Sequence, residues 1–391
     1  MATSLHKGRS VALALIVAST LLGLMGTDLV LPAVPSLPEA LGGDAAAAQL
    51  VLAAYVAGTA IGLLAFGALG DRFGTRALLI GSLLLTGLVS LACARSTDID
   101  TLIALRAVQG AVASGPAVFA PAIVRALFDE AGAVRAIGLL GSIESLAPAL
   151  APILGVWLLA IGGWPLSFEI IGGIAMLLAL AFALYPALPQ AARRPSGSYR
   201  RLLGDAVYLR YALSHALTLG GLLVFVFAAP AAIVRGMDGA LSSFIIMQVC
   251  GIAMFIVAAN AAGGLASRHG AERMIGIGTA LCAVGAVAIL AYVLAGGRDM
   301  WIVTALFVPM NFGLGLRGPP GFFRAVVASH GDDARGAALV ILGIVGSTAI
   351  GTAAVAPFVE RGLSAPALAA TVFEIGALLF LRLPKLNSAS D

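Results

Sequence analysis

The sequence has few charged residues, few cysteines and few histidines for its length. Only 11% of its 391 residues are Asp, Glu, Lys or Arg, against about 25% in a typical soluble domain. Its three cysteines all fall inside apolar stretches, and its four histidines are scattered along the chain. We see no disulfide framework, no metal-ligand spacing and no Ser/His/Asp set. These absences argue against a disulfide-rich secreted domain, a metal site and a hydrolase.

Apolar residues take the place of the missing charges. Hydrophobic residues make up 60% of the chain, and the mean hydropathy is +1.04. A soluble domain of this composition would have almost no polar surface, so the chain is expected to lie in a membrane. The net charge is only +4, and the basic residues are spread over short loops; we therefore expect no nucleic-acid partner. The first apolar run is too long for a signal peptide and is read as a helix.

Apolar runs and their breaks predict twelve membrane-spanning helices, because about 20 apolar residues cross a bilayer. Their predicted ranges are 11–34, 46–69, 77–94, 101–124, 136–160, 166–187, 211–234, 242–265, 274–295, 301–323, 337–358 and 366–383. With the N-terminus placed in the cytoplasm, seventeen of the 23 Lys and Arg residues fall in cytoplasmic loops and tails, and four fall in outer loops. This asymmetry follows the positive-inside rule and predicts that both termini are cytoplasmic.

The chain is expected to consist of two six-helix bundles, residues 1–188 and 211–391, joined by a cytoplasmic linker at 189–210. The linker is the longest polar segment and carries five arginines, four of them between residues 193 and 201. Two short patterns recur at nearly the same offset: Gly67–Gly74 is echoed at Gly263–Gly270, and Phe168-Glu169-Ile170 at Phe373-Glu374-Ile375. Parallel six-helix repeats of this kind place a substrate site near the midplane between the halves.

A tight charged turn separates the second and third predicted helices. Its candidate gating residues are Gly67, Asp71, Arg72, Gly74 and Arg76. The glycines let the backbone turn sharply and let the helix ends approach closely. The three charged side chains cannot lie in hydrocarbon, so they place this turn at the water interface.

The same turn resembles the loop between helices two and three of the major facilitator superfamily, Gly-x-Leu-x-Asp-Arg-x-Gly-Arg-Arg. Thr75 stands where that pattern has one of its basic residues. The resemblance implies a gating role, in which Asp71 caps the positive end of a neighbouring helix near Arg335. The echo in the second half has Ser267 in place of the aspartate and lacks this function.

Asp28 and Arg106 are the candidate pair for proton coupling. By helix rise, Asp28 lies about 25 Å from Val11, and Arg106 lies about 7 Å below the outer end of the fourth helix, so their depths match. Arginine favours an ionised carboxylate, whereas apolar burial favours the neutral acid, and a proton carrier needs this competition. The arginine also resembles the helix-four motif of the superfamily, which is implicated in proton coupling. Two alternatives stay open: a purely structural ion pair, and an Asp28 that extends to the outer water interface.

The fifth predicted helix carries Gly141, Pro148, Pro152 and Gly155 on one face. Prolines and small residues permit a kink and a close approach to another helix. The pattern resembles a degenerate form of the superfamily's antiporter motif, which is typical of exporters rather than symporters. Glu144 lies near the same face and is expected to be a second proton site or a contact for a cationic drug. The alternative is a neutral glutamate that is hydrogen-bonded to a neighbouring helix.

The remaining intramembrane polar residues are less specific. The candidates for a substrate cavity are Tyr55, Gln109, Asn260, Asn311 and Arg317, although an isolated polar residue in a helix often serves an interhelical hydrogen bond. Arg317 is expected to extend to the cytoplasmic interface; if it faces a cavity instead, anionic or zwitterionic substrates become plausible. Glu169 and Glu374 are expected at the outer interface or in packing.

Together these motifs resemble the bicyclomycin/chloramphenicol-resistance branch of the twelve-helix drug:proton antiporters. The resemblance implies an all-α membrane protein of the major facilitator fold that exports small amphipathic drugs or metabolites by alternating access. Asp28 would carry the proton, Arg106 would modulate it, and Glu144 would bind substrate or a second proton. We expect no enzymatic activity and no cofactor, since the proton gradient drives transport. The expected partners are substrate, protons and membrane lipid, and the expected form is a monomer in the bacterial inner membrane.

Two other classes of function stay open. One is a proton symporter or a dedicated exporter of an anionic or zwitterionic metabolite on the same fold. The other, less favoured, is a membrane receptor or enzyme that transports nothing.

Overall fold

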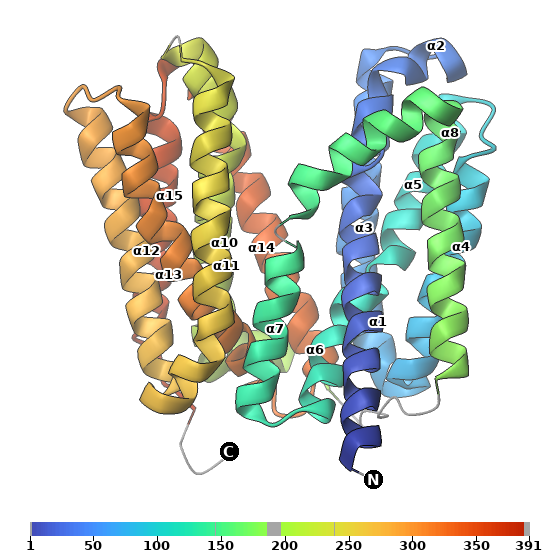
Figure 1. The fold of residues 1–391 in the computed structure, drawn as a ribbon, viewed down its shortest axis with the longest axis horizontal. Coiled ribbons are helices and arrows are strands. Elements are labelled where there is room, and N and C mark those ends of the chain that lie inside the picture. Colours follow the sequence, from blue (N-terminus) through green and yellow to red (C-terminus); the bar gives the residue numbers. More distant parts are fainter. Residues whose placement is uncertain (1, 145, 186–196, 238, 387–391) are drawn as a thin grey trace. The chain divides into compact units, whose positions relative to one another are not determined.

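The computed structural model describes residues 2–144, 146–185, 197–237 and 239–386, and every regular element in these ranges is a helix (Figure 1). The side chains of some helical residues, among them Asp71, Pro148 and Pro152, lie outside this description. In chain order the elements are α1 (Ala2–Asp28), η1 (Leu31–Ser36), α2 (Leu37–Leu41), α3 (Ala45–Phe73), α4 (Thr75–Cys93), α5 (Ile99–Ala113), α6 (Gly115–Leu127), α7 (Glu130–Glu144), α8 (Ala147–Leu184), α9 (Tyr199–Gly204), α10 (Ala206–Gly236), α11 (Leu241–His269), α12 (Ala271–Leu294), α13 (Met300–Val327), α14 (Asp333–Val355), η2 (Ala356–Arg361) and α15 (Ser364–Phe380).

The chain forms two compact units, and neither is one continuous stretch of sequence. Unit 1 comprises Met1–Leu127, Ile143–Ser198 and Asp332–Ala338, and unit 2 comprises Phe128–Ser142, Tyr199–Gly331 and Leu339–Asp391. Most of α7 therefore belongs to unit 2, and the first residues of α14 belong to unit 1. The predicted linker 189–210 lies partly outside the described residues, and its described part contains α9.

Four of the few acidic residues begin helices. The carboxylates of Asp44, Asp98, Asp205 and Asp299 accept hydrogen bonds from backbone N–H groups in the first turns of α3, α5, α10 and α13. A carboxylate in this position satisfies a donor that the helix leaves unpaired, and it faces the positive end of the helix dipole. These charges thus fix where apolar helices start.

The predicted fourth helix, 101–124, is broken into α5 and α6. The first ends at Ala113 and the second begins at Gly115. Pro116, in the first turn of α6, has no N–H to donate to the preceding turn, and its ring disfavours helical geometry in the residue before it. The apolar run continues through this point, but the regular helix does not.

The predicted fifth helix, 136–160, is also broken. It begins earlier than expected within α7, which ends at Glu144, and the chain resumes as α8 at Ala147. A proline stands in the first turn of α8, where its missing N–H costs no hydrogen bond. The proline therefore starts a helix here, whereas the sequence pattern had placed it inside one.

The break predicted between residues 160 and 166 is a kink at one residue. α8 consists of two helical segments joined at Gly163, whose φ is 69° and ψ is −170°. Only glycine adopts this conformation without strain. Figure 1 shows the resulting bend of α8.

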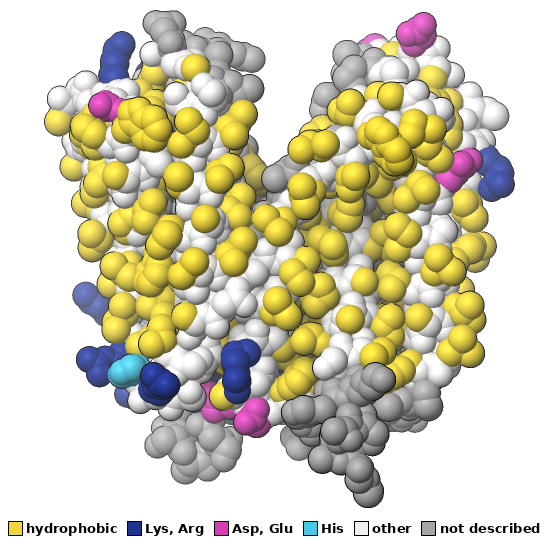
Figure 2. All heavy atoms as spheres, viewed as in Figure 1, with side chains coloured by type: hydrophobic (Ala, Val, Ile, Leu, Met, Phe, Trp, Pro, Cys, Tyr) yellow, Lys and Arg dark blue, Asp and Glu magenta, His cyan; other side chains and the backbone are white. Residues whose placement is uncertain are grey.

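The described part of the chain contains ten helical segments that are long and apolar enough to cross a membrane, and α15 is a shorter apolar helix. On the face drawn in Figure 2, hydrophobic side chains cover the length of the helices and charged ones gather toward their ends. Large side chains such as Ile61, Ile153, Leu177 and Val284 are more than 60% exposed. Surfaces of this kind suit lipid rather than water.

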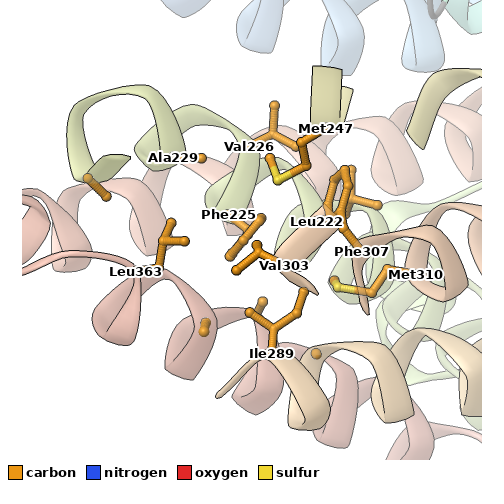
Figure 3. Close-up of a cluster of buried hydrophobic side chains, with 14 of the residues drawn as sticks. Leu222, Phe225, Val226, Ala229, Met247, Ile289, Val303, Phe307, Met310 and Leu363 are labelled. Atoms are coloured by element: carbon orange, nitrogen blue, oxygen red, sulfur yellow. The ribbon is translucent and has the colours of Figure 1, made fainter. Parts of the chain in front are cut away.

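Unit 2 has a dense apolar core between α10, α12, α13 and α15 (Figure 3). The rings of Phe225 and Phe307 lie 5.5 Å apart at its centre, and Met247 of α11 packs against the same cluster. This core holds in register the helices that carry the polar residues of unit 2.

In unit 1, glycines bring α3 and α5 into backbone contact. A Cβ atom at Gly58 would lie 1.9 Å from the carbonyl oxygen of Ala107, and one at Gly62 would lie 2.0 Å from that of Ala111. The same holds from the other side, since a Cβ at Gly110 would lie 2.0 Å from a carbonyl oxygen of α3. Small residues four apart are a common means of close helix packing in membranes.

Candidate functional site

A fully buried arginine connects three helices of unit 1. Arg106 of α5 is 0% exposed. Its Nη1 donates hydrogen bonds to the carbonyl oxygen of Gly26, at 2.9 Å, and to Oε1 of Gln109, at 2.7 Å. Its Nε donates to the carbonyl oxygen of Val51, at 3.2 Å. All three acceptors are neutral, so the positive charge is solvated but not cancelled.

Two aromatic rings enclose the same guanidinium. Its central carbon lies 4.2 Å from the ring centre of Tyr55 and 5.6 Å from that of Phe168. The faces of these rings attract the cation. The Tyr55 hydroxyl donates to the carbonyl oxygen of Gly23, at 2.7 Å, and a Cβ at Gly26 would collide with this hydroxyl. Tyr55, a candidate for the substrate cavity, therefore belongs to the surroundings of Arg106.

Gln109 extends the network to α4. Its Oε1 accepts from Arg106, and its Nε2 donates to the Ser90 hydroxyl at 2.6 Å. Ser90 in turn donates to the carbonyl oxygen of Thr86, at 2.6 Å. Gln109 is completely buried. In this structure it therefore forms hydrogen bonds between helices, which was the alternative to a place in the substrate cavity.

Asp28 is the last residue of α1, because the helix ends six residues before the predicted 34 and continues as η1. It is half-buried. Arg106 binds the carbonyl oxygen of Gly26, two residues before Asp28 in the chain. Among the described residues, however, the two side chains form no ion pair: Nε and Nη1 of Arg106 bind neutral acceptors, and its buried Nη2 has no hydrogen-bond partner. A carboxylate at the C-terminal end of a helix also faces the negative end of the dipole, which disfavours a second negative charge.

Glu144 lies at the end of α7 and, unlike most of that helix, belongs to unit 1. The Thr20 hydroxyl of α1 is a hydrogen-bonding neighbour of its carboxyl group. Thr20 and Asp28 are eight residues apart on one helix, or about 12 Å by helix rise. Two carboxyl groups thus lie at different heights along α1: that of Glu144 beside Thr20, and that of Asp28 at the end of the helix.

The charged turn joins α3 to α4 at Gly74, whose φ is 81°. Arg72 is exposed, and Arg76 donates to the carbonyl oxygen of Ala183 at the end of α8, at 2.9 Å. A Cβ added at Gly70 would lie 3.2 Å from that of Ala334. The turn therefore packs against the beginning of α14.

The expected neighbour of this turn is also its observed neighbour. Arg335 donates through Nη2 to the carbonyl oxygen of Ala68, at 3.2 Å. The side chain of Asp71 lies outside the described residues, so the contact predicted for it is not tested. Gly67 is buried in α3.

The two glycines of the candidate antiporter motif have different surroundings. A Cβ at Gly155 would lie 2.4 Å from the carbonyl oxygen of Leu29 and 3.0 Å from the Pro32 ring. Gly155 therefore lets α8 approach the segment that follows Asp28. Gly141 lies in unit 2 and borders the Phe255 ring at an ordinary distance. The side chains of Pro148 and Pro152 lie outside the described residues.

Three candidates lie in unit 2. Asn260 is exposed and donates to the Ser142 hydroxyl at 2.9 Å, and the buried Asn311 donates to the carbonyl oxygen of Phe307 within its own helix. Arg317 was expected to extend to the cytoplasmic interface, and this is wrong: its side chain is 0% exposed and donates to the carbonyl oxygen of Ser214, at 2.8 Å. It stays inside because Ser214 offers it two acceptors.

Sequence reasoning missed the part that Phe168, Ser90 and Thr20 play beside the expected residues. Phe168 was noted only as part of a repeat, and the two hydroxyls had no distinguishing pattern. The close packing of α3 on α5 had a visible signal, because Gly58 and Gly62 are four residues apart. Within the described ranges, no three His, Cys, Asp or Glu side chains gather so as to hold a metal ion.

Comparisons with known proteins agree on one family. The family model described as Major Facilitator Superfamily matches residues 16–356. A chloramphenicol resistance protein of Pseudomonas aeruginosa is 31% identical over 304 residues, which cover 72% of this chain and 70% of that protein. An uncharacterized MFS-type transporter of Bacillus subtilis, YdgK, is 34% identical over 54% of this chain and 55% of its own length. The multidrug resistance protein MdtL of Citrobacter koseri is 29% identical over 52% and 54%. The matched stretch thus spans about half the length of the latter two.

Solved structures show the same fold. The transporter FucP in the outward conformation superimposes with a TM-score of 0.71 at 16% identity, over 95% of this chain and 99% of that one. The human organic anion transporter MFSD10 gives a TM-score of 0.69 at 16% identity, over 94% and 98%. With its apolar helices and its family match across most of its length, this chain is a multi-pass membrane protein and belongs to the major facilitator superfamily.

Proposed function

We propose that this protein exports small amphipathic drugs or metabolites from the bacterial cell in exchange for protons. Asp28 is the proton carrier, Arg106 modulates it, and Glu144 binds a second proton or the substrate. The observation that carries the proposal is the position of Arg106, a buried cation without an ion-pair partner in the described structure, bound to the backbone two residues before Asp28.

This position gives Asp28 two stable forms. A neutral Asp28 leaves the guanidinium with its carbonyl, amide and aromatic neighbours. An ionised Asp28 is attracted by the same guanidinium, because opposite charges interact strongly in an apolar region. Loss of a proton therefore favours a shorter distance between α5 and the end of α1, and this change of contacts couples protonation to conformation. The proton gradient supplies the energy, and the proposal involves no cofactor and no enzymatic step.

The relatives favour drug export over other transport. Three of them are named for resistance to chloramphenicol, bicyclomycin or multiple drugs. These names describe drug resistance; because the chain has the fold of a transporter, we interpret resistance here as export of the drug.

The proposal also includes the number of membrane crossings, the side on which the termini lie, and the division into two halves. Twelve crossings result if α5 and α6 form one crossing, α7 and the first segment of α8 another, and the second segment of α8 a third. Both termini are then cytoplasmic, and the halves are residues 1–188 and 211–391. The charged turn and the start of α14 form the cytoplasmic gate. The protein works as a monomer surrounded by lipid.

Proton symport is the second candidate. Its sequence argument was an Arg317 that faces the substrate. The guanidinium instead lies within unit 2, bound to Ser214, so this argument loses its support. A receptor or membrane enzyme has no observation in its favour.

Purified protein in lipid vesicles with an imposed pH gradient tests the proposal. Chloramphenicol is the first probe. Antiport predicts uptake into vesicles that are acidic inside, and Asp28→Asn abolishes this uptake while exchange of labelled for unlabelled drug continues. Glu39→Gln, which neutralises an exposed acid of α2, serves as control. Uptake driven by an acidic exterior would establish symport instead, and transport indifferent to pH would contradict proton coupling.

A further inference from the structure

Unit 2 contains a buried polar cluster that the proposed mechanism does not use. Ser214, His215 and Thr218 of α10, Arg317 of α13 and Glu374 of α15 are all at most 6% exposed. Ser214 and Thr218 are four residues apart and share one face of α10. The helices that carry the cluster pack on the apolar core of Figure 3.

Arg317 is only partly satisfied. Its Nη1 and Nη2 donate to the carbonyl and hydroxyl oxygens of Ser214, at 2.8 and 3.2 Å, whereas its buried Nε has no partner. Gly321, one turn further along α13, leaves room beside it: a Cβ there would lie 3.0 Å from Nη2 and 3.5 Å from Nδ1 of His215. The guanidinium thus keeps one free donor, and it packs so closely on Gly321 that a larger residue there would crowd it.

Glu374 is fully buried, and neither of its carboxyl oxygens has a hydrogen-bond partner of good geometry. The Thr218 hydroxyl is a neighbouring donor to this carboxyl group, and it too has no hydrogen-bond partner of good geometry. In the described residues, no Lys, Arg or His nitrogen lies within 4 Å of it. A carboxylate without a partner is very costly in such surroundings, whereas the neutral acid is tolerated far better. The geometry is therefore that of a protonated side chain.

The other titratable groups around Glu374 are few. Arg317 and the Cys282 thiol of α12 interact with its charge, and His215 lies next to Arg317. Arg361, at the end of η2 and three residues before α15, is exposed. Arg317 is thus the cation placed to stabilise an ionised Glu374.

The repeat in the sequence allows the buried arginine and the glutamate of unit 1 to be compared with those of unit 2. In each unit, the buried arginine binds a backbone carbonyl of the first long helix: Arg106 binds α1 and Arg317 binds α10. The triplets 168–170 and 373–375 differ at this point. Glu169 is exposed, whereas Glu374 is buried. Of the two triplets, therefore, only the one in unit 2 places its glutamate in the helix interior.

We propose that Glu374 is a second proton-binding site, with Arg317 as the cation that holds its carboxylate once the proton has left. The proton passes from the carboxyl group to water when the site opens to solvent. The free Nε of Arg317 then donates to the carboxylate, and the net charge of the pair falls from +1 to zero. This proposal rests on the proposed proton-coupled transport for its role in the cycle.

Infrared spectroscopy of the full-length protein in detergent tests proton binding without any substrate. Subtracting the Glu374→Gln spectrum from the wild-type spectrum at neutral pH should show the C=O band of a protonated carboxylic acid. The same subtraction for Glu169→Gln, the exposed counterpart, is the control for the spectral change that comes from replacing any glutamate by glutamine. Glutamine matches the neutral acid in shape, so this variant should keep its thermal stability, and Glu374→Asp should retain a protonated band if glutamine does not fold. An ionised carboxylate signal from Glu374 would overturn the proposal.

The role in transport is measured by proton release on adding substrate. Glu374→Gln should release one proton fewer per bound substrate than wild type and shift the pH profile of release. Unchanged stoichiometry and profile in Glu374→Gln would overturn the role in transport. If wild type released no proton despite binding, the proposed antiport would fail, and the infrared band alone would still decide whether Glu374 carries a proton.

Discussion

Arg106 shows why a buried cation need not be cancelled by an acid. Its Nε and Nη1 donate to two carbonyls and an amide, its Nη2 has no hydrogen-bond partner, and its faces meet two aromatic rings. These neighbours lower the cost of burial yet leave the positive charge without an ion-pair partner in the described structure. Lysine has no planar fork, so it cannot reproduce this set of contacts.

Arg106→Lys is expected to lower stability by about 1.5–3 kcal/mol, the cost of losing a hydrogen bond to a charged group. It should also weaken proton release on substrate binding, because Asp28 loses its fixed cation. Thermal melting in detergent measures the first effect. Arg95→Lys, at an exposed position, is the control, and equal melting of both variants would contradict this account of Arg106.

For unit 1, the sequence indicated at which positions along the helices polar residues stand, but not which side chains they contact. The matching heights of Asp28 and Arg106 are a prediction from counting residues along apolar runs, and the structure shows that Arg106 binds the α1 backbone two residues before Asp28. The direction of each side chain depends on three-dimensional neighbours such as Phe168 and Ser90, which no spacing rule brings together. The burial of Arg317 could not be foreseen because snorkelling and internal pairing produce the same one-dimensional pattern.

At the scale of helices, apolar runs located the segments but not their breaks. The pattern at 101–124 is apolar throughout, and only Pro116 marks the interruption. At Gly163 the sequence predicted a loop between two helices, whereas in the structure the helix continues through a kink at this single glycine. Proline and glycine act on the backbone directly, so they override a hydrophobic pattern that concerns side chains alone.

The contact between α3 and α5 depends on the absence of side chains. Gly58→Ala is expected to destabilise the protein by about 1–3 kcal/mol, because its Cβ would force the helices apart. Gly81→Ala is the matched control: it lies in α4 and has nothing within 4 Å of the added carbon. Melting temperatures decide, and a Gly58→Ala variant as stable as Gly81→Ala would disprove the close packing.

The start of α5 should depend on pH through Asp98. Hydrogen bonds from the backbone N–H and hydroxyl of Thr101 lower the pKa of this exposed carboxyl group. Its ionised form therefore stabilises the folded state above the unfolded pKa of about 3.9, and this contribution is lost as pH falls through the lower folded value. Asp98→Ala should thus be less stable than wild type at pH near 7, with the difference shrinking on acidification. Asp100→Ala is the control, and a difference independent of pH would contradict the prediction.

At the scale of the molecule, each unit includes a short segment from the other half of the sequence. Within unit 1, Arg125 and Asp333 form an ion pair at 2.7 Å; within unit 2, Arg324 and Glu130 form one at 2.9 Å. These pairs fasten the starts of α14 and α7, and the start of α14 belongs to the proposed gate.

Asp333→Arg is expected to weaken the attachment of α14 by about 0.5–1 kcal/mol, since the pair is partly exposed, and to slow drug transport. Arg125→Asp combined with Asp333→Arg restores an attractive pair and should recover transport in vesicles. If the double variant is no better than Asp333→Arg alone, the ion pair does not serve the gate.

The measurement that tests the central claim most directly is the pH change in a weakly buffered detergent solution when candidate drugs are added. Proton exchange through Asp28 predicts acidification by the wild-type protein and none by Asp28→Asn, at drug concentrations that both proteins are shown to bind. Acidification that persists in Asp28→Asn, or its absence from wild type despite binding, would contradict it.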